Sequence, residues 1–508
     1  MNKTGYFSFY SLIALLIVKA LFMILWIQYS GLQLAPDEAQ YWTWSQHLDW
    51  GYYSKPPAIS WQIWLGTKVL GNTVIGVRIG AVILSFLISV SVYFLALVAG
   101  LQPRTAFWAG VLSALSPMGF FASYYATTDI GMVLFWTLCC LVLVSALRHQ
   151  KTPRYLLLGL LVGVGALYKW PIYLILVIVL LTLVFVPYFR SWMVIPCCCL
   201  SLLGLVPSVV WNMERGWPTF RHVWGAMSGD HGVRTSLFHG NFWDFFGAQA
   251  ALLSPIFFLF LLFSFASLIR HWNKIPLTLK FCGLFSLVIL VPYQTAALFQ
   301  KIQGNWCVFV YPMATVFVTW YLLEFVSWGK KWLPIGVGVS LSLVTIIFTL
   351  PLAQVYGIGP PIPLKANRYN ECMGWDNIKA CLEAVGYDPK THILVSHRYQ
   401  MTSLLSFYSP GQKRAYFLNL NGRRLNQFSF WSGMEKGQSG FFVISEEMPF
   451  ETKAAQKRYQ EMLTSYFNGV TYVGWTPLLE IYGEAGKVLL IFSFDDYNGK
   501  IPSPANHY

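Results

Sequence analysis

Long apolar runs with almost no charged residues occupy most of the first 355 residues of the chain. A bilayer core about 30 Å thick needs roughly 20 apolar residues for each crossing helix. Runs of about this length recur, separated by short turns that contain Lys, Arg, Pro or Gly. The eleven spans predicted in this way lie at 8–29, 75–99, 105–124, 129–147, 155–168, 171–187, 193–211, 242–269, 276–299, 306–326 and 333–353. The pattern predicts a polytopic α-helical membrane protein.

The composition supports this class and excludes others. Hydrophobic residues make up 56% of the chain and charged residues only 11%, whereas soluble domains carry about 25% charged residues. These values exclude a disordered chain and a soluble two-domain enzyme. The unbroken apolar runs also exclude an outer-membrane barrel, because apolar and polar residues alternate along the strands of such a barrel. The net charge of +14 is typical of basic cytoplasmic loops and contacts with anionic lipid. No basic stripe stands apart from the spans, so we expect membrane lipids and no nucleic acid as partners.

The distribution of Lys and Arg between the short loops predicts the orientation. The region 155–187 is interrupted by Lys169 and Pro171, so we divide it into two short spans. The basic turns then fall on the same side as the N-terminus, which we expect to be cytoplasmic. The outer side holds the loops 30–74, 212–241 and 300–305, the turn at 127–129 and everything after about residue 354. The first span lacks a small-residue cleavage site and is predicted to be a retained signal anchor.

From Gln354 onward the sequence becomes mixed and polar. Strand-like runs at 392–396, 440–444 and 487–494 alternate with helix-like runs at 375–384 and 452–467. We therefore expect a transmembrane domain at 1–355 and a small α/β outer domain at 356–508, joined by a proline-rich linker at 357–363. Seven of the nine cysteines lie in apolar runs and are expected to pack there, while Cys372 and Cys381 of the outer domain allow either a disulfide or two free thiols.

The first outer loop contains the most informative residues. Asp37 and Glu38 directly follow the first span and are surrounded by aromatic residues. They either begin a solvated loop in an interfacial aromatic belt or provide a carboxylate that acts as a general base. Farther along the loop, Lys55 stands between two tyrosines and two prolines, which hold the backbone. Its side chain either extends to lipid headgroups or binds a phosphate at the membrane surface.

Other acids and bases fall on the same outer side. Asp129 begins the fourth span, where an Asp is most simply a helix cap, but it also adds a third carboxylate near Asp37. Lys169 adds a second outer cation. The loop 212–241 adds further basic and histidine side chains at Arg215, Arg221, His222, His231, Arg234 and His239. Each alone is ordinary surface, whereas together they indicate a site where acids and bases meet at one membrane face.

The order and spacing of these motifs resemble a known family. The matching segments lie at 36–42, 51–57, 76–78, 128–129, 168–171, 211–217, 249–255 and 305–312. They are similar to the bacterial branch of the protein O-mannosyltransferase and aminoarabinose transferase family, across about the first 330 residues. These membrane enzymes have the C-type glycosyltransferase fold and use polyprenyl-phosphate sugars. The resemblance therefore implies this fold, with about eleven transmembrane helices, and this activity.

The resemblance also implies roles for particular residues. Asp37 matches the catalytic acid of the Asp-Glu pair, with Glu38 and Asp129 as the other acids of the site. Lys55 and Lys169 match lysines near the carrier phosphate, which the arginines of loop 212–241, Arg215, Arg221 and Arg234, are expected to assist. Sugar or acceptor contacts are expected from Tyr41, Tyr52, Tyr53, His231, His239, Asn305 and Trp306. In the aminoarabinose transferases a Glu before the lysine helps to bind a metal; Ser54 stands here, so a divalent metal is not favoured and no other cofactor is expected.

These expectations describe an inverting glycosyltransferase of a bacterial inner membrane, with its catalytic loops and outer domain in the periplasm. The donor is a sugar on undecaprenyl phosphate, and the favoured acceptor is lipid A or lipopolysaccharide core. A secreted protein is the alternative acceptor. A transporter or channel would place charges at mid-membrane and show symmetry between halves, whereas the charges here gather at the outer loops. A scaffold whose outer domain binds a partner is a third possibility.

Overall fold

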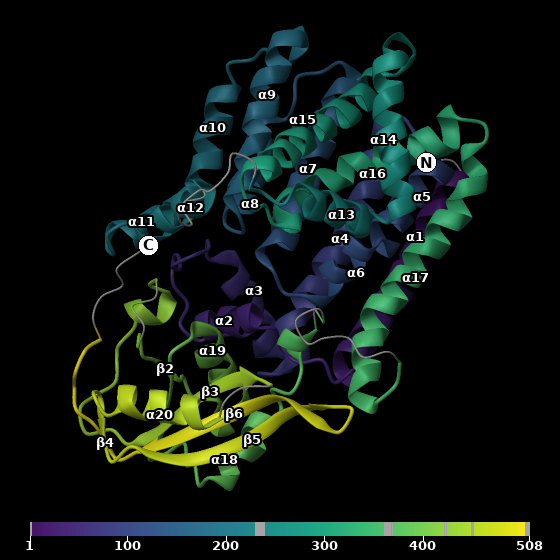
Figure 1. Cartoon of the computed structure of the whole chain (residues 1–508). Coiled ribbons are helices and arrows are strands. Elements are labelled where there is room, and N and C mark those ends of the chain that lie inside the picture. Colours follow the sequence, from purple (N-terminus) through teal and green to yellow (C-terminus); the bar gives the residue numbers. More distant parts are fainter. Residues whose placement is uncertain are drawn as a thin grey trace.

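The structure is a computed structural model that describes residues 3–228, 239–359, 367, 369–420, 422, 424–448 and 452–502. A helical bundle occupies the upper part of Figure 1 and a mixed sheet with three helices lies beneath it. The bundle and the helices of its outer loops comprise α1 (Lys3–Tyr29), α2 (Pro36–Ser45), α3 (Ala58–Leu70), α4 (Val74–Ala99), α5 (Pro103–Leu115), α6 (Pro117–Tyr124), α7 (Thr128–His149), α8 (Tyr155–Ala166), α9 (Leu174–Phe185), α10 (Val194–Leu202), α11 (Val206–Met213), α12 (Pro218–Ser228), α13 (Phe242–Leu253), α14 (Pro255–Arg270), α15 (Leu277–Phe299), α16 (Tyr311–Trp320) and α17 (Trp332–Ala353).

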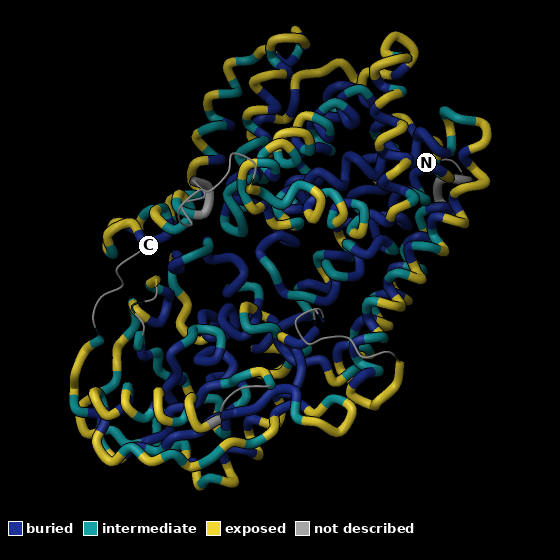
Figure 2. Tube along the Cα trace, in the orientation of Figure 1, coloured by how far each residue is buried: buried dark blue, intermediate teal, exposed yellow. Residues whose placement is uncertain are grey.

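Each of the eleven predicted apolar spans is helical in the structure. Within the described ranges, seven helices are long and apolar enough to cross a membrane, and two bent helix pairs raise this number to nine. The two remaining predicted spans correspond to the shorter apolar helices Tyr155–Ala166 and Trp170–Phe185. Apolar side chains that face outward, such as Phe185 on α9 and Ile195 on α10, suit contact with lipid tails, and Figure 2 shows exposed positions along this edge of the bundle. The polytopic helical fold predicted from the sequence is confirmed.

Two predicted spans are broken rather than continuous. The span 105–124 bends by 58° between α5 and α6, and the span 242–269 bends by 105° between α13 and α14. Both breaks precede a proline, Pro117 and Pro255, that opens the following helix. A proline lacks the N–H that would continue the preceding helix, and its ring disfavours helical backbone before it. Ser116 caps α6 by accepting a hydrogen bond from the Gly119 N–H at 3.1 Å.

Hydrogen bonds between loops show which helix ends lie together. At one end of the bundle, the Gln102 N–H donates to the Glu324 carboxylate at 2.9 Å, and the Thr278 hydroxyl donates to the Ala99 carbonyl at 2.7 Å. The predicted cytoplasmic turns around residues 99–104 and 274–278 therefore meet. The first predicted outer loop, with α2 and α3, lies away from this end, next to the sheet part (Figure 1).

The C-terminal part contains a five-stranded mixed sheet. Its strands are β1 (Ile393–Ser396), β2 (Tyr416–Phe417), β3 (Gly440–Glu447), β5 (Thr471–Ile481) and β6 (Glu484–Phe494), in the order β2-β1-β3-β6-β5. The β1 strand pairs in parallel with β2 and β3, whereas β6 is antiparallel to β3 and β5. A separate ladder joins β4 (Phe467–Asn468) to β7 (Asp496–Tyr497), and the helices are α18 (Asn377–Ala384), α19 (Tyr399–Tyr408) and α20 (Thr452–Leu463). The predicted strands appear as β1, β3 and β6, while β5 and α19 were not predicted.

The sheet part is joined to the first outer loop by a shared apolar core. This core includes Trp42 of α2 and Phe407 of α19, whose rings meet edge to face at 4.9 Å between centroids. The Tyr408 hydroxyl accepts a hydrogen bond from the Leu34 N–H at 2.7 Å, and the Gln427 side chain accepts one from the Tyr53 N–H at 2.7 Å. The C-terminal part with the sheet, called the outer part from here on, therefore holds the loop that carries Asp37 and Lys55.

Cys372 and Cys381 are free thiols, so the disulfide that their positions allow is not formed. Their sulfur atoms have different neighbours. Cys372 Sγ lies 3.6 Å from the Tyr125 hydroxyl, and Cys381 Sγ lies 3.7 Å from the Thr476 hydroxyl. Both cysteines are buried packing residues in separate apolar clusters.

Candidate active site

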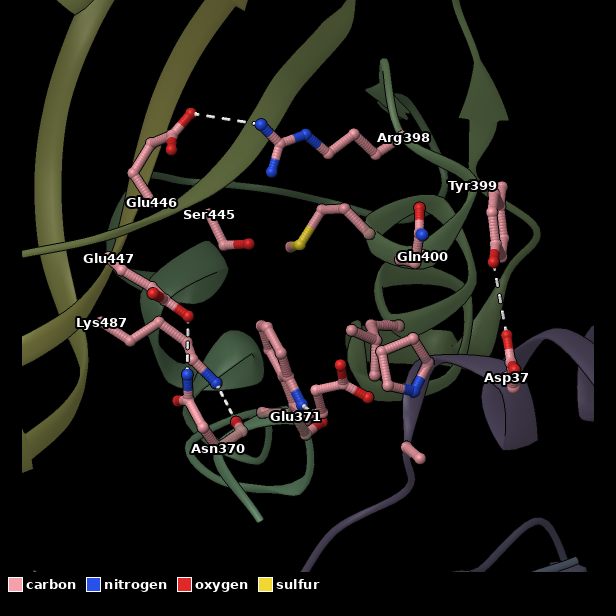
Figure 3. A pocket seen from close by; sticks show the side chains of 15 residues that line it. Asp37, Asn370, Glu371, Arg398, Tyr399, Gln400, Ser445, Glu446, Glu447 and Lys487 are labelled. Atoms are coloured by element: carbon pink, nitrogen blue, oxygen red, sulfur yellow. Dashed lines mark hydrogen bonds and ion pairs between the residues drawn. The ribbon is translucent and has the colours of Figure 1, made fainter. Parts of the chain in front are cut away.

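Asp37 lies in the first turn of α2, where Pro36 opens the helix. A helix N-terminus favours a negative charge, and the proline has no N–H to leave unpaired. The Tyr399 hydroxyl of α19 donates a hydrogen bond to the Asp37 carboxylate at 3.4 Å (Figure 3). Burial raises the pKa of Asp37 above its ordinary value, while the nearby Lys55, Tyr399 and Arg424 oppose this shift. A carboxylate with a raised pKa in a polar cluster suits a general base.

Glu38 occupies a different environment although it is the next residue. Its carboxylate accepts two hydrogen bonds from the Arg78 guanidinium, at 2.9 and 2.7 Å, and one each from the backbone N–H groups of Ala35 and Ala126. The Glu38 and Arg78 side chains are 2% and 0% exposed. This ion pair ties α2, α4 and the turn before α7 together. A carboxylate so fully bonded and buried cannot reach a substrate, which argues against the catalytic role predicted for Glu38.

Lys169 and Asp129 form an ion pair near Lys55. The Lys169 Nζ lies 2.6 Å from one Asp129 oxygen, and the Asn305 amide donates to the other oxygen at 3.1 Å. The break between α8 and the short helix Trp170–Tyr173 places Lys169 beside the start of α7. Lys55 is in the same group, because burial and then Lys169 lower its pKa, whereas Asp129 and Asp37 oppose this. Lys169 is therefore paired with Asp129, and Lys55 lies within electrostatic reach of Lys169, Asp129 and Asp37.

Arg424 and Tyr399 come from the outer part and were not predicted. Arg424 adds a third cation, which acts electrostatically on both Asp37 and Lys55. Its Nη1 lies 3.3 Å from His222 Nδ1 on α12. Burial, then Arg424 and Lys55, lower the pKa of His222 to about 4, so this imidazole is neutral at pH 7 and its Nδ1 can accept a hydrogen bond from the guanidinium. No signal in the sequence links Arg424 to a loop some 370 positions earlier, because their contact depends on the folded outer part.

The three predicted tyrosines are all buried but have different neighbours. Tyr41, on α2, is 5% exposed and lies near enough to Asp37 for this acid, after burial, to raise the pKa of the phenol. Tyr52 is fully buried, stacks on Trp44 with 4.6 Å between ring centroids, and accepts a hydrogen bond from the Ser60 hydroxyl at 3.0 Å. Tyr53 packs against His222 and Phe430, with ring centroids 5.2 and 6.0 Å away. The contacts of Tyr52 argue for a structural role, so the predicted sugar contact at Tyr52 has no support in the geometry.

The other predicted residues are less close to Asp37. Arg215 pairs with Asp49 and Glu214, at 3.5 and 2.8 Å, and stacks on Trp211, which argues against the predicted phosphate contact. The Trp306 indole donates to the Gln303 side chain at 3.2 Å. Arg221 and His239 are exposed on the outer side of the bundle. His231 and Arg234 lie outside the described residues.

A metal site was not favoured on sequence grounds. Across the ranges that the structure describes, no group of three or more His, Cys, Asp or Glu side chains is arranged to hold a metal ion. Cations of the protein itself lie near the two acids: Lys55 and Arg424 act on Asp37, and Lys169 pairs with Asp129. This arrangement suits the binding of a phosphate, which attracts fixed ammonium and guanidinium groups strongly where water is scarce.

Comparisons with known proteins identify relatives of this chain. Residues 54–211 match the model of a family described as dolichyl-phosphate-mannose-protein mannosyltransferase. The chain is 25% identical over 401 residues to the lipid A galacturonosyltransferase RgtD of Rhizobium johnstonii, covering 77% of this chain and 80% of that protein. It is 33% identical over 171 residues to the undecaprenyl phosphate-alpha-4-amino-4-deoxy-L-arabinose arabinosyl transferase of Pseudomonas aeruginosa, covering 30% of this chain and 31% of that one.

The fold has solved relatives of the same kind. The crystal structure of ArnT from Cupriavidus metallidurans bound to undecaprenyl phosphate matches with a TM-score of 0.62 and 14% identity, over 94% of this chain and 97% of that one. The apo structure of the same protein matches with a TM-score of 0.61. These matches show the fold, and the fold and site together define a membrane glycosyltransferase of the C-type class.

Within this class, the chain is related to the protein O-mannosyltransferase and aminoarabinose transferase family, as its motifs predicted. The enzyme class predicted from the sequence is thereby confirmed. The multi-pass membrane character is confirmed as well.

Proposed function

We propose that the protein moves a sugar from undecaprenyl phosphate to lipid A or lipopolysaccharide core, with inversion at the sugar. The observation that carries this proposal is a single carboxylate, Asp37, held near the cations Lys55 and Arg424, with Lys169 acting on Lys55 in turn. The acid suits removal of a proton from the acceptor, and the cations suit the departing phosphate. The related proteins named above act on lipid A or carry undecaprenyl phosphate in their names, which supports the same donor and acceptor here.

The proposed reaction is one direct displacement. An acceptor hydroxyl attacks the anomeric carbon on the face opposite the phosphate, and its proton passes to the Asp37 carboxylate. The bond between the anomeric carbon and the phosphate oxygen breaks, and the electron pair leaves with undecaprenyl phosphate. The leaving group needs no proton, so stabilising its negative charge is the main electrostatic task.

Each cation is held by a different part of the chain. Lys55 lies in the first outer loop, Lys169 at the break after α8, and Arg424 in the outer part, with a hydrogen bond to His222 of α12. Asp129 and Asn305 orient Lys169 rather than act on the sugar. Glu38, through Arg78, fixes the start of α2 and therefore the position of Asp37. Tyr41 and Tyr53 are retained as sugar contacts in this proposal.

The proposed location is a bacterial inner membrane with a cytoplasmic N-terminus. The basic turns meet at one end of the bundle, which suits the cytoplasmic side, and the site lies at the other end with the sheet part. We accordingly propose a transmembrane domain at 1–355 and a periplasmic domain at 356–508, whose Tyr399 and Arg424 reach the site.

The test uses the purified full-length protein in nanodiscs, with radiolabelled undecaprenyl-phosphate sugars and whole lipopolysaccharide as acceptor. Wild type should transfer label into a product that resists protease and extracts with lipid. Asp37→Asn should lower kcat by about 10²–10⁴-fold while donor binding stays unchanged. The matched control is Asp376→Asn, which replaces an exposed aspartate of the outer part and should behave as wild type.

If the label entered an exported protein instead of lipid, the proposed reaction would stand, but the acceptor would be a protein. Turnover by Asp37→Asn above about one tenth of wild type would rule out the general-base role.

A further inference from the structure

A cavity of about 690 Å³ opens between the start of α2 and the sheet part (Figure 3). Its volume lies within the range of about 300–1,000 Å³ that is usual for small-molecule sites. Strand β3 forms one side with Ser445, Glu446 and Glu447, while Asp37 and Tyr399 stand on the other side. The cavity therefore adjoins the proposed catalytic base directly.

The three cations of the site do not line this cavity, although Asp37 does. Asp37 and Tyr399 line the cavity, whereas its lining does not include Lys55, Lys169 or Arg424, which the structure all describes. In an inverting displacement the acceptor approaches the anomeric carbon opposite the phosphate, next to the base. A donor phosphate held by the cations would not occupy this cavity, so the cavity is available to the acceptor.

The charges of the cavity wall are mainly negative. Four acids line it, Asp37, Glu371, Glu446 and Glu447, against two bases, Arg398 and Lys487. Both bases are engaged by the protein. Arg398 lies 3.9 Å from Glu446, and the Lys487 ammonium donates to the carbonyls of Asn370 and Met373 and lies over the Trp375 ring.

The remaining polar groups are neutral or acidic. Glu371 and Glu447 are exposed, and the Glu371 carboxylate has no hydrogen-bond or ion-pair partner among the described residues. Ser445 and Gln400 add a hydroxyl and an amide on facing walls (Figure 3). Carboxylates, hydroxyls and amides hydrogen-bond sugar hydroxyl and amino groups, whereas uncompensated carboxylates repel a phosphate.

We propose that this cavity binds the acceptor through a sugar ring that carries hydroxyl or amino groups and no phosphate. The bond that forms joins the oxygen of one of its hydroxyl groups to the anomeric carbon of the donor, and the proton passes to Asp37. This assignment rests on the proposed function, which it deepens by naming a sugar hydroxyl, and not a phosphate, as the point of attachment.

The first experiment measures binding without any donor, so it does not depend on transfer. The probe is core oligosaccharide released from lipopolysaccharide, used before and after enzymatic removal of its phosphates, and the protein is the full chain in nanodiscs. Wild type should bind the dephosphorylated probe more tightly. Ser445→Tyr, which fills the cavity from a half-buried position of β3, should weaken binding at least tenfold, whereas the control Glu383→Gln on α18 should not. Equal binding by wild type and Ser445→Tyr, or tighter binding of the phosphorylated probe, would overturn the proposal.

The second experiment separates acceptor from donor. In the transfer assay, Ser445→Tyr should raise the KM for the acceptor while the KM for the donor stays unchanged, and a rise confined to the donor KM would assign the cavity to the donor sugar instead. Glu371→Gln should reduce the preference for the dephosphorylated acceptor about fivefold, the order expected for removal of one unit charge across a partly solvated site. Absence of transfer by wild type, with probe binding as predicted, would refute the proposed function and leave the cavity assignment standing.

Discussion

Replacing Glu38 by Gln should destabilise the protein strongly, because Glu38 holds α2 in place and does not itself act on the substrate. In the folded protein this carboxylate accepts four hydrogen bonds, two from the Arg78 guanidinium and one each from the backbone N–H groups of Ala35 and Ala126. Gln keeps one acceptor oxygen but turns an NH₂ group toward donors. Arg78 would then be a fully buried cation without a countercharge, left with neutral partners such as the carbonyls of Leu32 and Gln33 and the ring of Tyr124.

The magnitude follows from the burial of this pair. Removal of one partner from a buried ion pair costs about 3–5 kcal/mol, because the other charge is left uncompensated. We therefore expect Glu38→Gln to lower the free energy of unfolding by this amount. The double variant Glu38→Gln with Arg78→Met removes both charges and should cost less than the two single variants added together.

The assay is equilibrium unfolding of the purified protein in mixed micelles, followed by tryptophan fluorescence, together with kcat per folded molecule. The control is Glu324→Gln at the other end of the bundle, where an exposed carboxylate accepts one backbone N–H. This control should cost about 1 kcal/mol or less. Wild-type stability of Glu38→Gln combined with a kcat reduced a hundredfold or more would refute the reasoning, because Glu38 would then act on the substrate.

Other predictions concern the charges around the site. As the pH falls, kcat/KM should decline when Asp37 takes up a proton. Because burial raises the pKa of Asp37, this decline should begin at a higher pH than for an exposed aspartate. A profile that is flat down to about pH 4 would contradict the role of Asp37 as a base. Arg424→Ala should raise the KM for the donor about tenfold, because one of three cations is lost, while the exposed Lys436→Ala should not. Burial lowers the pKa of Lys487 from 10.5 to about 8, so between these values the unfolded chain binds more protons and the free energy of unfolding should rise with pH. Lys487→Met should lack this rise in unfolding experiments at about pH 8 and about pH 10.

The residues that the sequence identified well are those fixed by local pattern. The apolar runs predicted the helices because burial in lipid needs a nearly fixed length of apolar chain. Lys169 was found because a lysine and a proline interrupt an otherwise apolar region, and the structure places this break beside Asp129. Asp37 was found as an acid directly after a span, and it lies in the first turn of α2.

The residues that the sequence missed or misjudged depend on contacts between distant segments. Asp37 and Glu38 are adjacent in the sequence, but a helical turn points one toward Tyr399 and the other toward Arg78. Arg424 joins the site only because the outer part packs on α2, which hydrophobic periodicity does not reveal. Arg215 carries the charge that a phosphate site needs, but the fold pairs it with nearby acids.

The central claim is that a sugar reaches a lipid through Asp37, and mass spectrometry of lipid A and lipopolysaccharide core tests it most directly. The samples are cells with the protein, cells without it, and cells that express Asp37→Asn at the wild-type level. We expect a mass increment of one sugar that is present with wild type and absent from both other samples. Lipid masses that are identical in all three samples, under conditions where the donor is made, would contradict the account.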